Sequence, residues 1–111
     1  MNPAIFREYD IRGIADQDYD VEFARLLGRA YATYVADKGV QRVTVGRDCR
    51  LTSAKYADAL KDGLRASGLN VVDLGMTPTP LVYFSLYHLD VDGGIQVTGS
   101  HNPPDHNGFK I

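Results

Sequence analysis

The sequence has few of the features that hold secreted or membrane proteins together. It contains a single cysteine among 111 residues, Cys49, so an internal disulfide is excluded, which fits a reducing compartment. No stretch approaches 18 unbroken apolar residues, and residues 1–8 lack a basic segment followed by an apolar one. Neither a membrane-spanning helix nor a secretory signal is therefore indicated. We expect a soluble, cytoplasmic protein with no membrane partner.

The chain also lacks any marked excess of charge. Twelve basic and fourteen acidic residues give a net charge of −2. Nucleic acids and acidic membranes both require a clustered positive surface, so neither is an expected partner. With 44% hydrophobic and 23% charged residues, the composition is that of an ordinary globular protein. Repeats, low-complexity tracts and linkers are absent, so residues 1–111 are expected to form one domain.

Strand-like and helix-like segments alternate along the chain. Strands are expected at 5–10, 42–46, 70–75 and 93–98, and helices at 20–39, 52–68 and 79–89, with a loop at 99–108. Asp20 suits the N-cap of the first helix and Gly39 its end. This alternation predicts the α/β class, a three-layer α/β/α fold around a four-stranded sheet that is mostly parallel or mixed, since the direction of the first strand is left open.

The third expected helix differs from the other two. Apolar side chains wrap right round residues 81–89 instead of lying on one face. A helix that is apolar all round is usually covered on more than one side, so we expect this helix to lie between two surfaces.

The loops that follow the expected strands contain the least ordinary residues. They span 10–13, 46–52, 76–80 and 99–108. In open α/β sheets, ligands bind beyond the carboxyl ends of the strands. The pattern therefore predicts a functional site at this edge.

The loop Thr98–Pro104, with sequence TGSHNPP, has the most unusual composition of the four. Gly99 allows either a close approach of the backbone to a ligand or a positive φ, and two prolines restrict the loop. A plain tight turn with a capping serine fits the same residues equally well. A serine hydrolase is disfavoured, because adjacent side chains in extended backbone point to opposite sides and Asn102 breaks the Gly-x-Ser-x-Gly pattern.

Ser100 is instead a candidate phosphate carrier. A phosphoserine has about −1.5 to −2 charges and needs cations and donors nearby. The candidate cations are Arg12, Arg47, Arg50 and Lys110, although each taken alone is equally consistent with a solvated surface charge. Asp10 and Asp48 are placed to orient these arginines. The three histidines lack the spacing of zinc ligands.

Four segments occur together in an order that resembles a known family. They are Phe6–Gly13 (FREYDIRG), Val45–Arg50 (VGRDCR), Gly75–Pro80 (GMTPTP) and Thr98–Lys110 (TGSHNPPDHNGFK). Nearly the whole chain is similar to the first domain of the α-D-phosphohexomutases, and to the phosphomannomutase/phosphoglucomutase branch most of all. The phosphoglucosamine mutase branch is the alternative, but it tends to have a threonine in the opening motif and an alanine in place of Gly99.

The resemblance implies an activity and a set of site residues. Ser100 would carry a phosphoryl group to a hexose monophosphate and recover one from the bisphosphorylated sugar, with hexose 1,6-bisphosphate as activator. Mg²⁺ would bind through the phosphate on Ser100. The residues implied as catalytic are Ser100, Lys110 as general acid/base, Arg12 and His101. The residues implied as supporting are Tyr9, Asp10, Arg47, Asp48 and Asn102.

The resemblance also implies partners. Enzymes of this family have four domains, and the metal loop, the sugar-specificity loop and the distal phosphate loop lie in the other three. Residues 1–111 are thus expected to be a first domain truncated at its C-terminal end, inactive alone and prone to self-association through an exposed interdomain surface that includes part of the helix at 81–89. The alternative is a catalytically idle folding or binding module derived from that domain.

Overall fold

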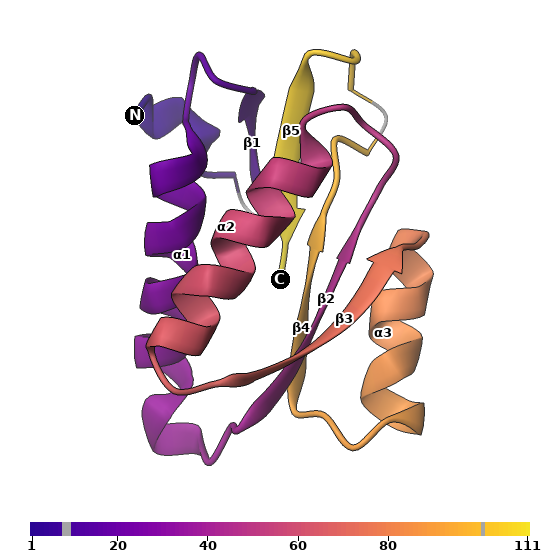
Figure 1. The fold of residues 1–111 in the computed structure, drawn as a ribbon. Coiled ribbons are helices and arrows are strands. Elements are labelled where there is room, and N and C mark those ends of the chain that lie inside the picture. Colours follow the sequence, from indigo (N-terminus) through magenta and orange to yellow (C-terminus); the bar gives the residue numbers. More distant parts are fainter. Residues whose placement is uncertain (8–9, 101) are drawn as a thin grey trace.

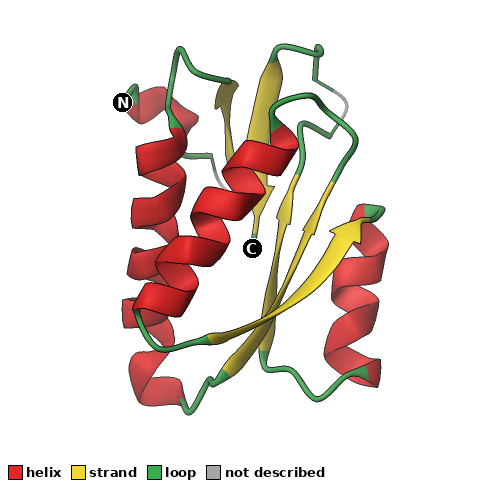
Figure 2. Ribbon diagram, in the orientation of Figure 1, coloured by secondary structure: helices red, strands yellow, loops and turns green. Residues whose placement is uncertain are grey.

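The structure is a computed structural model, and it describes residues 1–7, 10–100 and 102–111. Its helices are η1 (Pro3–Ile5), α1 (Val21–Val35), η2 (Ala36–Lys38), α2 (Ser53–Ala66) and α3 (Thr79–His88), and its strands are β1 (Asp10–Ile14), β2 (Arg42–Arg47), β3 (Asn70–Met76), β4 (Gly93–Val97) and β5 (His106–Lys110). Figures 1 and 2 show them in the same orientation. In the described part of the chain, no helix is long and apolar enough to cross a membrane.

The described strands form one mixed sheet in the order β1-β5-β4-β2-β3. β2 pairs in parallel with β3 and β4, whereas β5 runs antiparallel to β4 and β1. The prediction of an α/β fold with a mixed sheet is confirmed, but the expected count of four strands is wrong, because the described residues form five. The strand that was not predicted is β5, which lies largely within the segment expected to be a loop.

The first strand was also placed too early in the chain. Pro3–Ile5 forms a turn of 3-10 helix, and the strand begins only at Asp10. Asn2 caps that turn, where its side chain accepts a hydrogen bond from the amide of Ala4 at 3.0 Å. The cap accounts for the helical turn at Ile5, whereas Phe6 is extended and forms an isolated antiparallel bridge with Ile11.

Helices α1 and α2 cover one face of the sheet and build the main core. Val43, Val45, Ile95 and Val97 project from the strands into a buried cluster that includes Leu60 of α2. Tyr19, Tyr56 and Phe109 extend this cluster at the β5 end, with ring centroids 5.0 to 6.4 Å apart. Asp20 caps α1 by accepting from the amide of Phe23 at 3.0 Å, and Gly39 follows η2 with φ of 73°, as predicted.

The opposite face is covered by α3, and its contacts are smaller and more polar. Val82 lies against Gly46 and Gly94, and Thr44 is hydrogen-bonded to Ser85 at 3.0 Å. This arrangement confirms the three-layer α/β/α architecture. The expectation that α3 is covered on two sides is wrong for this chain, since Val82 and Ser85 are its buried residues and most of its large apolar side chains are exposed.

Candidate functional site

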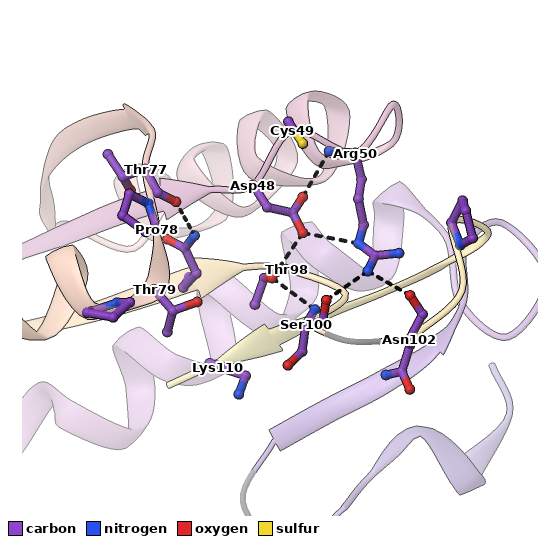
Figure 3. A pocket seen from close by; sticks show the side chains of 13 residues that line it. Asp48, Cys49, Arg50, Thr77, Pro78, Thr79, Thr98, Ser100, Asn102 and Lys110 are labelled. Carbon is purple, nitrogen blue, oxygen red and sulfur yellow. Dashed lines mark hydrogen bonds and ion pairs between the residues drawn. The ribbon is translucent and has the colours of Figure 1, made fainter.

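An open pocket of about 740 Å³ lies at the carboxyl edge of the parallel strands. Its walls come from the loops after β2, β3 and β4 and from the end of β5, and are formed by Asp48, Cys49, Arg50, Thr77, Pro78, Thr79, Pro80, Gln96, Thr98, Ser100, Asn102, Pro104 and Lys110. Three of the four predicted loops therefore meet at one site (Figure 3). The pocket lies at the edge where the alternation of strands and helices predicted a site.

The loop that carries Ser100, residues 98–105 between β4 and β5, is called the serine loop, and the Arg50 side chain occupies its inside. Its Nε donates to Asp48 Oδ2 at 3.1 Å, Nη1 donates to the carbonyls of Pro103 at 2.6 Å and His106 at 3.2 Å, and Nη2 donates to those of Ser100 at 3.0 Å and Asn102 at 2.8 Å. A guanidinium has five N–H groups, so all of its donors are occupied. Arg50 lines the same pocket as Ser100, as expected of a candidate cation, but its donors are directed to the loop, so it has none left for a phosphate.

Asp48 joins the β2 loop to the serine loop. Its Oδ1 accepts from the amide of Arg50 at 3.1 Å and from the Ser53 hydroxyl, while Oδ2 accepts from Thr98 Oγ1 at 2.9 Å and the amide of Gly99 at 3.0 Å. Burial raises the pKa of Asp48, but hydrogen bonds from Ser53 and from the amides of Arg50 and Gly99 outweigh it and hold the pKa below its ordinary value. Asp48 therefore stays ionised and anchors both loops.

Ser100 is held in the left-handed backbone region, with φ of 54°. This conformation is unfavourable for a residue with a Cβ and is kept only where the surroundings impose it. The amide of Ser100 donates to Thr98 Oγ1 at 3.0 Å, and that of Asn102 donates to the Gly99 carbonyl at 3.0 Å. The positive φ considered for Gly99 therefore falls on the serine. Gly99 is needed for close approach, because a Cβ there would overlap the Arg50 guanidinium.

Arg12 and Lys110 lie on the same face of the β1–β5 pair. Asp10 is opposite Lys110 in the ladder, and Ile11 and Phe109 between them point to the core. Arg12 Nε donates to both Asp10 oxygens at 2.9 Å, and the Asp10 side chain is only 5% exposed. Asp10 therefore orients Arg12, as predicted.

The structure divides the predicted site residues between two hollows. Ser100, Lys110 and Asp48 line the main pocket, whereas Arg12 lines a smaller hollow of about 280 Å³. Asn102 lines both.

Two predicted residues that the structure describes, Asp10 and Arg47, line neither hollow. Arg47 is absent from both linings and makes a long contact of 3.4 Å from Nη1 to the Asp48 carbonyl. Tyr9 and His101 lie outside the described residues, so their assignments stay predictions.

Two residues of the pocket were missed in the sequence. Gln96 Nε2 donates to the Thr77 carbonyl at 2.8 Å, and Gln96 Oε1 and Thr77 Oγ1 are buried in the described structure without a hydrogen-bond partner. A glutamine in an otherwise apolar strand, Gly-Gly-Ile-Gln-Val, was an available signal, because buried polar side chains need a reason. The role of the Thr98 side chain was also missed. Its hydroxyl donates to Asp48 and accepts from the amide of Ser100.

The residues present do not by themselves fit a magnesium site. Within the described ranges, no three His, Cys, Asp or Glu side chains lie close enough together to hold a metal ion. Mg²⁺ requires about six oxygen ligands in octahedral geometry, and a phosphate on Ser100 would supply only part of that set.

The fold and the pocket define a class of protein: an α/β/α domain that presents a strained serine from a locked loop at the carboxyl edge of its sheet. Residues 3–111 match the family described as phosphoglucomutase/phosphomannomutase, alpha/beta/alpha domain I, and the chain belongs to this family. This result confirms the resemblance inferred from the four sequence segments.

Individual relatives agree with that assignment. A phosphoglucomutase of Neisseria meningitidis serogroup B is 44% identical over 107 residues, covering 96% of this chain and 23% of that protein. A phosphomannomutase of Vibrio cholerae is 47% identical over 111 residues, with coverages of 96% and 23%. Among solved structures, a phosphoglucomutase/phosphomannomutase family protein from Burkholderia thailandensis is 47% identical, with a TM-score of 0.90 over 98% of this chain and 26% of that chain. The chain thus spans about a quarter of the length of these relatives.

Proposed function

We propose that this chain is the phosphoserine-bearing part of an enzyme that interconverts hexose 1-phosphate and hexose 6-phosphate. The observation that supports the proposal is the geometry of Ser100, which stands in a strained backbone conformation at a pocket that Lys110 also lines. Strained residues of this kind are kept where function requires them. The names of the relatives, phosphoglucomutase and phosphomannomutase, support the same reaction class.

The proposed reaction moves one phosphoryl group in each half. Ser100 Oγ forms a bond to the phosphorus of a hexose 1,6-bisphosphate while the bond from that phosphorus to a sugar oxygen breaks. The proton of the serine hydroxyl leaves, and the freed sugar oxygen gains a proton. The reverse step then phosphorylates the other hydroxyl of the hexose monophosphate. Lys110 is proposed as the general acid/base and Arg12 as the cation beside the phosphate.

The remaining parts of the reaction are assigned to polypeptide outside this chain. We propose that other domains supply the ligands of a Mg²⁺ ion, which neutralises charge on the phosphate of Ser100 when bound. Those domains would also select the sugar and hold its distal phosphate. The described residues support this assignment, because they provide a serine loop but no group of side chains that could hold a metal ion.

Phosphorylation of Ser100 tests the proposal directly. After incubation with glucose 1,6-bisphosphate and Mg²⁺, intact-mass measurement is expected to show one added phosphoryl group on the chain and none on Ser100→Ala. Ser67→Ala, at the exposed end of α2, is the matched control and should gain the phosphoryl group as the unaltered chain does. An unmodified chain, or a phosphoryl group retained in Ser100→Ala, contradicts the assignment. Labelling of Ser100 by a fluorophosphonate would indicate a hydrolase instead.

The same samples separate a carrier from a complete enzyme. We propose that the isolated chain accepts the phosphoryl group without interconverting glucose 1-phosphate and glucose 6-phosphate, because it lacks a metal cluster within its described residues. Turnover close to that of a full-length relative would contradict this proposal. A chain that takes up no phosphoryl group at all would instead support the idle module.

The outer surface of α3 provides a separate test of incompleteness. Its exposed large apolar residues are Leu81, Tyr83, Phe84, Leu86 and Tyr87, and Leu89 follows directly. Apolar patches of this kind mark interaction sites. We propose that the rest of a longer polypeptide covers this surface, and that the isolated chain self-associates through it. Sedimentation velocity should show oligomers that Tyr87→Glu dissociates.

The control for this experiment lies on another helix. Tyr34 of α1 is 70% exposed, comparable with 85% for Tyr87, so Tyr34→Glu makes the same chemical change away from α3. It should leave the oligomers intact. A monomeric chain, or equal dissociation by both variants, would argue against α3 as the surface.

A further inference from the structure

Arg50, in the loop after β2, donates five hydrogen bonds to Asp48, the serine loop and His106, and it does not belong to the proposed chemistry. Its guanidinium donates to Asp48 and to four backbone carbonyls, and its side chain is 15% exposed. We propose that Arg50 is the positioning residue for phosphoryl transfer at Ser100, an inference that rests on the proposed function. It acts by holding the backbone around the serine, without touching the phosphate.

The loop requires a group of this shape. The carbonyl oxygens of Ser100, Asn102, Pro103 and His106 all converge on Arg50, and their dipoles repel one another without a cation between them. Arginine presents five donors in a rigid planar fork, whereas lysine presents three on a compact ammonium. Lysine at this position would therefore keep the charge but leave acceptors unpaired.

The serine depends on these contacts in two ways. The Arg50 bond to the Ser100 carbonyl at 3.0 Å fixes the peptide that follows a backbone φ of 54°, which an unrestrained serine rarely adopts. The same bond directs that carbonyl oxygen to the guanidinium, so this acceptor is not free to turn toward a phosphate on the serine. Arg50 thereby stabilises the strained conformation and removes a source of repulsion.

The charge of Arg50 is balanced inside the loop. Asp48 Oδ2 accepts from Arg50 Nε at 3.1 Å, and the Asp48 carboxylate also accepts from Thr98 and the amide of Gly99. The pair therefore ties the loop after β2 to the loop after β4. Because its charge and donors are engaged, Arg50 should affect the rate of phosphoryl transfer more than the affinity for a sugar bisphosphate.

The experiment compares Arg50→Ala with the unaltered chain, using the rate at which glucose 1,6-bisphosphate phosphorylates Ser100. We expect the saturating rate to fall by about 100-fold, the effect of misplacing a reacting group by about 1 Å. The half-saturating concentration should change by less than about threefold, because Arg50 does not touch the phosphate. Added ethylguanidinium should raise the rate of Arg50→Ala by at least about tenfold, and ethylammonium should not, since it lacks the planar fork.

Two further variants complete the comparison. Arg42→Ala removes an exposed arginine paired with Asp90 at 3.0 Å, and it should neither slow phosphorylation nor respond to ethylguanidinium. Arg50→Lys keeps the charge and most of the side-chain stem, so it serves if Arg50→Ala does not fold. It should also lose at least about tenfold in rate, since its ammonium cannot reach all the acceptors. A rate within threefold of the unaltered chain in either Arg50 variant overturns the inference, as does equal rescue by ethylammonium.

Amide hydrogen exchange separates failure of this inference from failure of the proposed function. The amides of Gly99 and Asn102 form hydrogen bonds inside the loop and should exchange faster in the Arg50 variants, and ethylguanidinium should restore their protection in Arg50→Ala. If the unaltered chain is never phosphorylated, the proposed function fails and Arg50 loses its role in transfer, while this result still decides whether it holds the loop. Unchanged exchange overturns the role of Arg50 in either case.

Discussion

Gly63→Ala is expected to lower the free energy of unfolding by about 2 kcal/mol, although alanine is the better helix former. Overpacking typically costs about 1–3 kcal/mol, and alanine in place of a helical glycine recovers about 0.5–1 kcal/mol. Gly63 of α2 faces α1 so closely that a Cβ would overlap the backbone carbonyl of Arg25. Backbone atoms cannot rotate away as a side chain can, so the two helices must separate and the core beneath them must open.

Gly28 of α1 faces α2 closely, as Gly63 faces α1. A Cβ on Gly28 of α1 would lie 2.5 Å from the Leu60 carbonyl oxygen and 2.9 Å from the Leu64 amide nitrogen. Gly28→Ala should therefore also destabilise the protein in urea titrations followed by circular dichroism. Asp62→Ala, an exposed neighbour of Gly63, is the control and should change stability by less than about 0.5 kcal/mol. A Gly63→Ala variant as stable as the unaltered chain would show that the helices adjust without loss.

The parts of the fold that were predicted correctly are those determined by local sequence. Asp20 and Gly39 mark the ends of the first helical segment because capping and left-handed backbone depend on nearby residues. The position of the pocket at the carboxyl edge likewise followed from the alternation of strands and helices. These features require only the period of apolar residues and the chemistry of turns.

The parts that were predicted wrongly depend on long-range contacts. β5, with sequence His-Asn-Gly-Phe-Lys, has little intrinsic preference for a strand, and it is extended because β1 and β4 pair with it on both sides. Likewise, a sequence identifies Arg50 as a cation but not the direction of its donors. The four carbonyls that engage it come from residues at least 50 positions away in the chain. Its role became visible only once the loop was folded.

Lys110→Met is expected to reduce phosphorylation of Ser100 by a factor on the order of 10²–10⁴, the usual contribution of a general acid or base. Lys110 lines the pocket with Ser100, and its backbone is fixed between Gln96 of β4 and Asp10 of β1. Stability should change little, because the side chain is partly exposed and methionine retains most of its length. The rate of mass gain with glucose 1,6-bisphosphate measures the effect.

A charge-preserving variant distinguishes the two ways in which Lys110 could act. Arginine keeps the positive charge but is not deprotonated in proteins, so Lys110→Arg retains a cation beside the phosphate and loses the proton transfer. If Lys110 is the general acid/base, Lys110→Arg should be less than about tenfold faster than Lys110→Met. Lys38→Met, at a half-exposed lysine paired with Asp37 in η2, is the control and should leave the rate unchanged. Full recovery by arginine would restrict Lys110 to electrostatic stabilisation, and the proton of Ser100 would then need another acceptor.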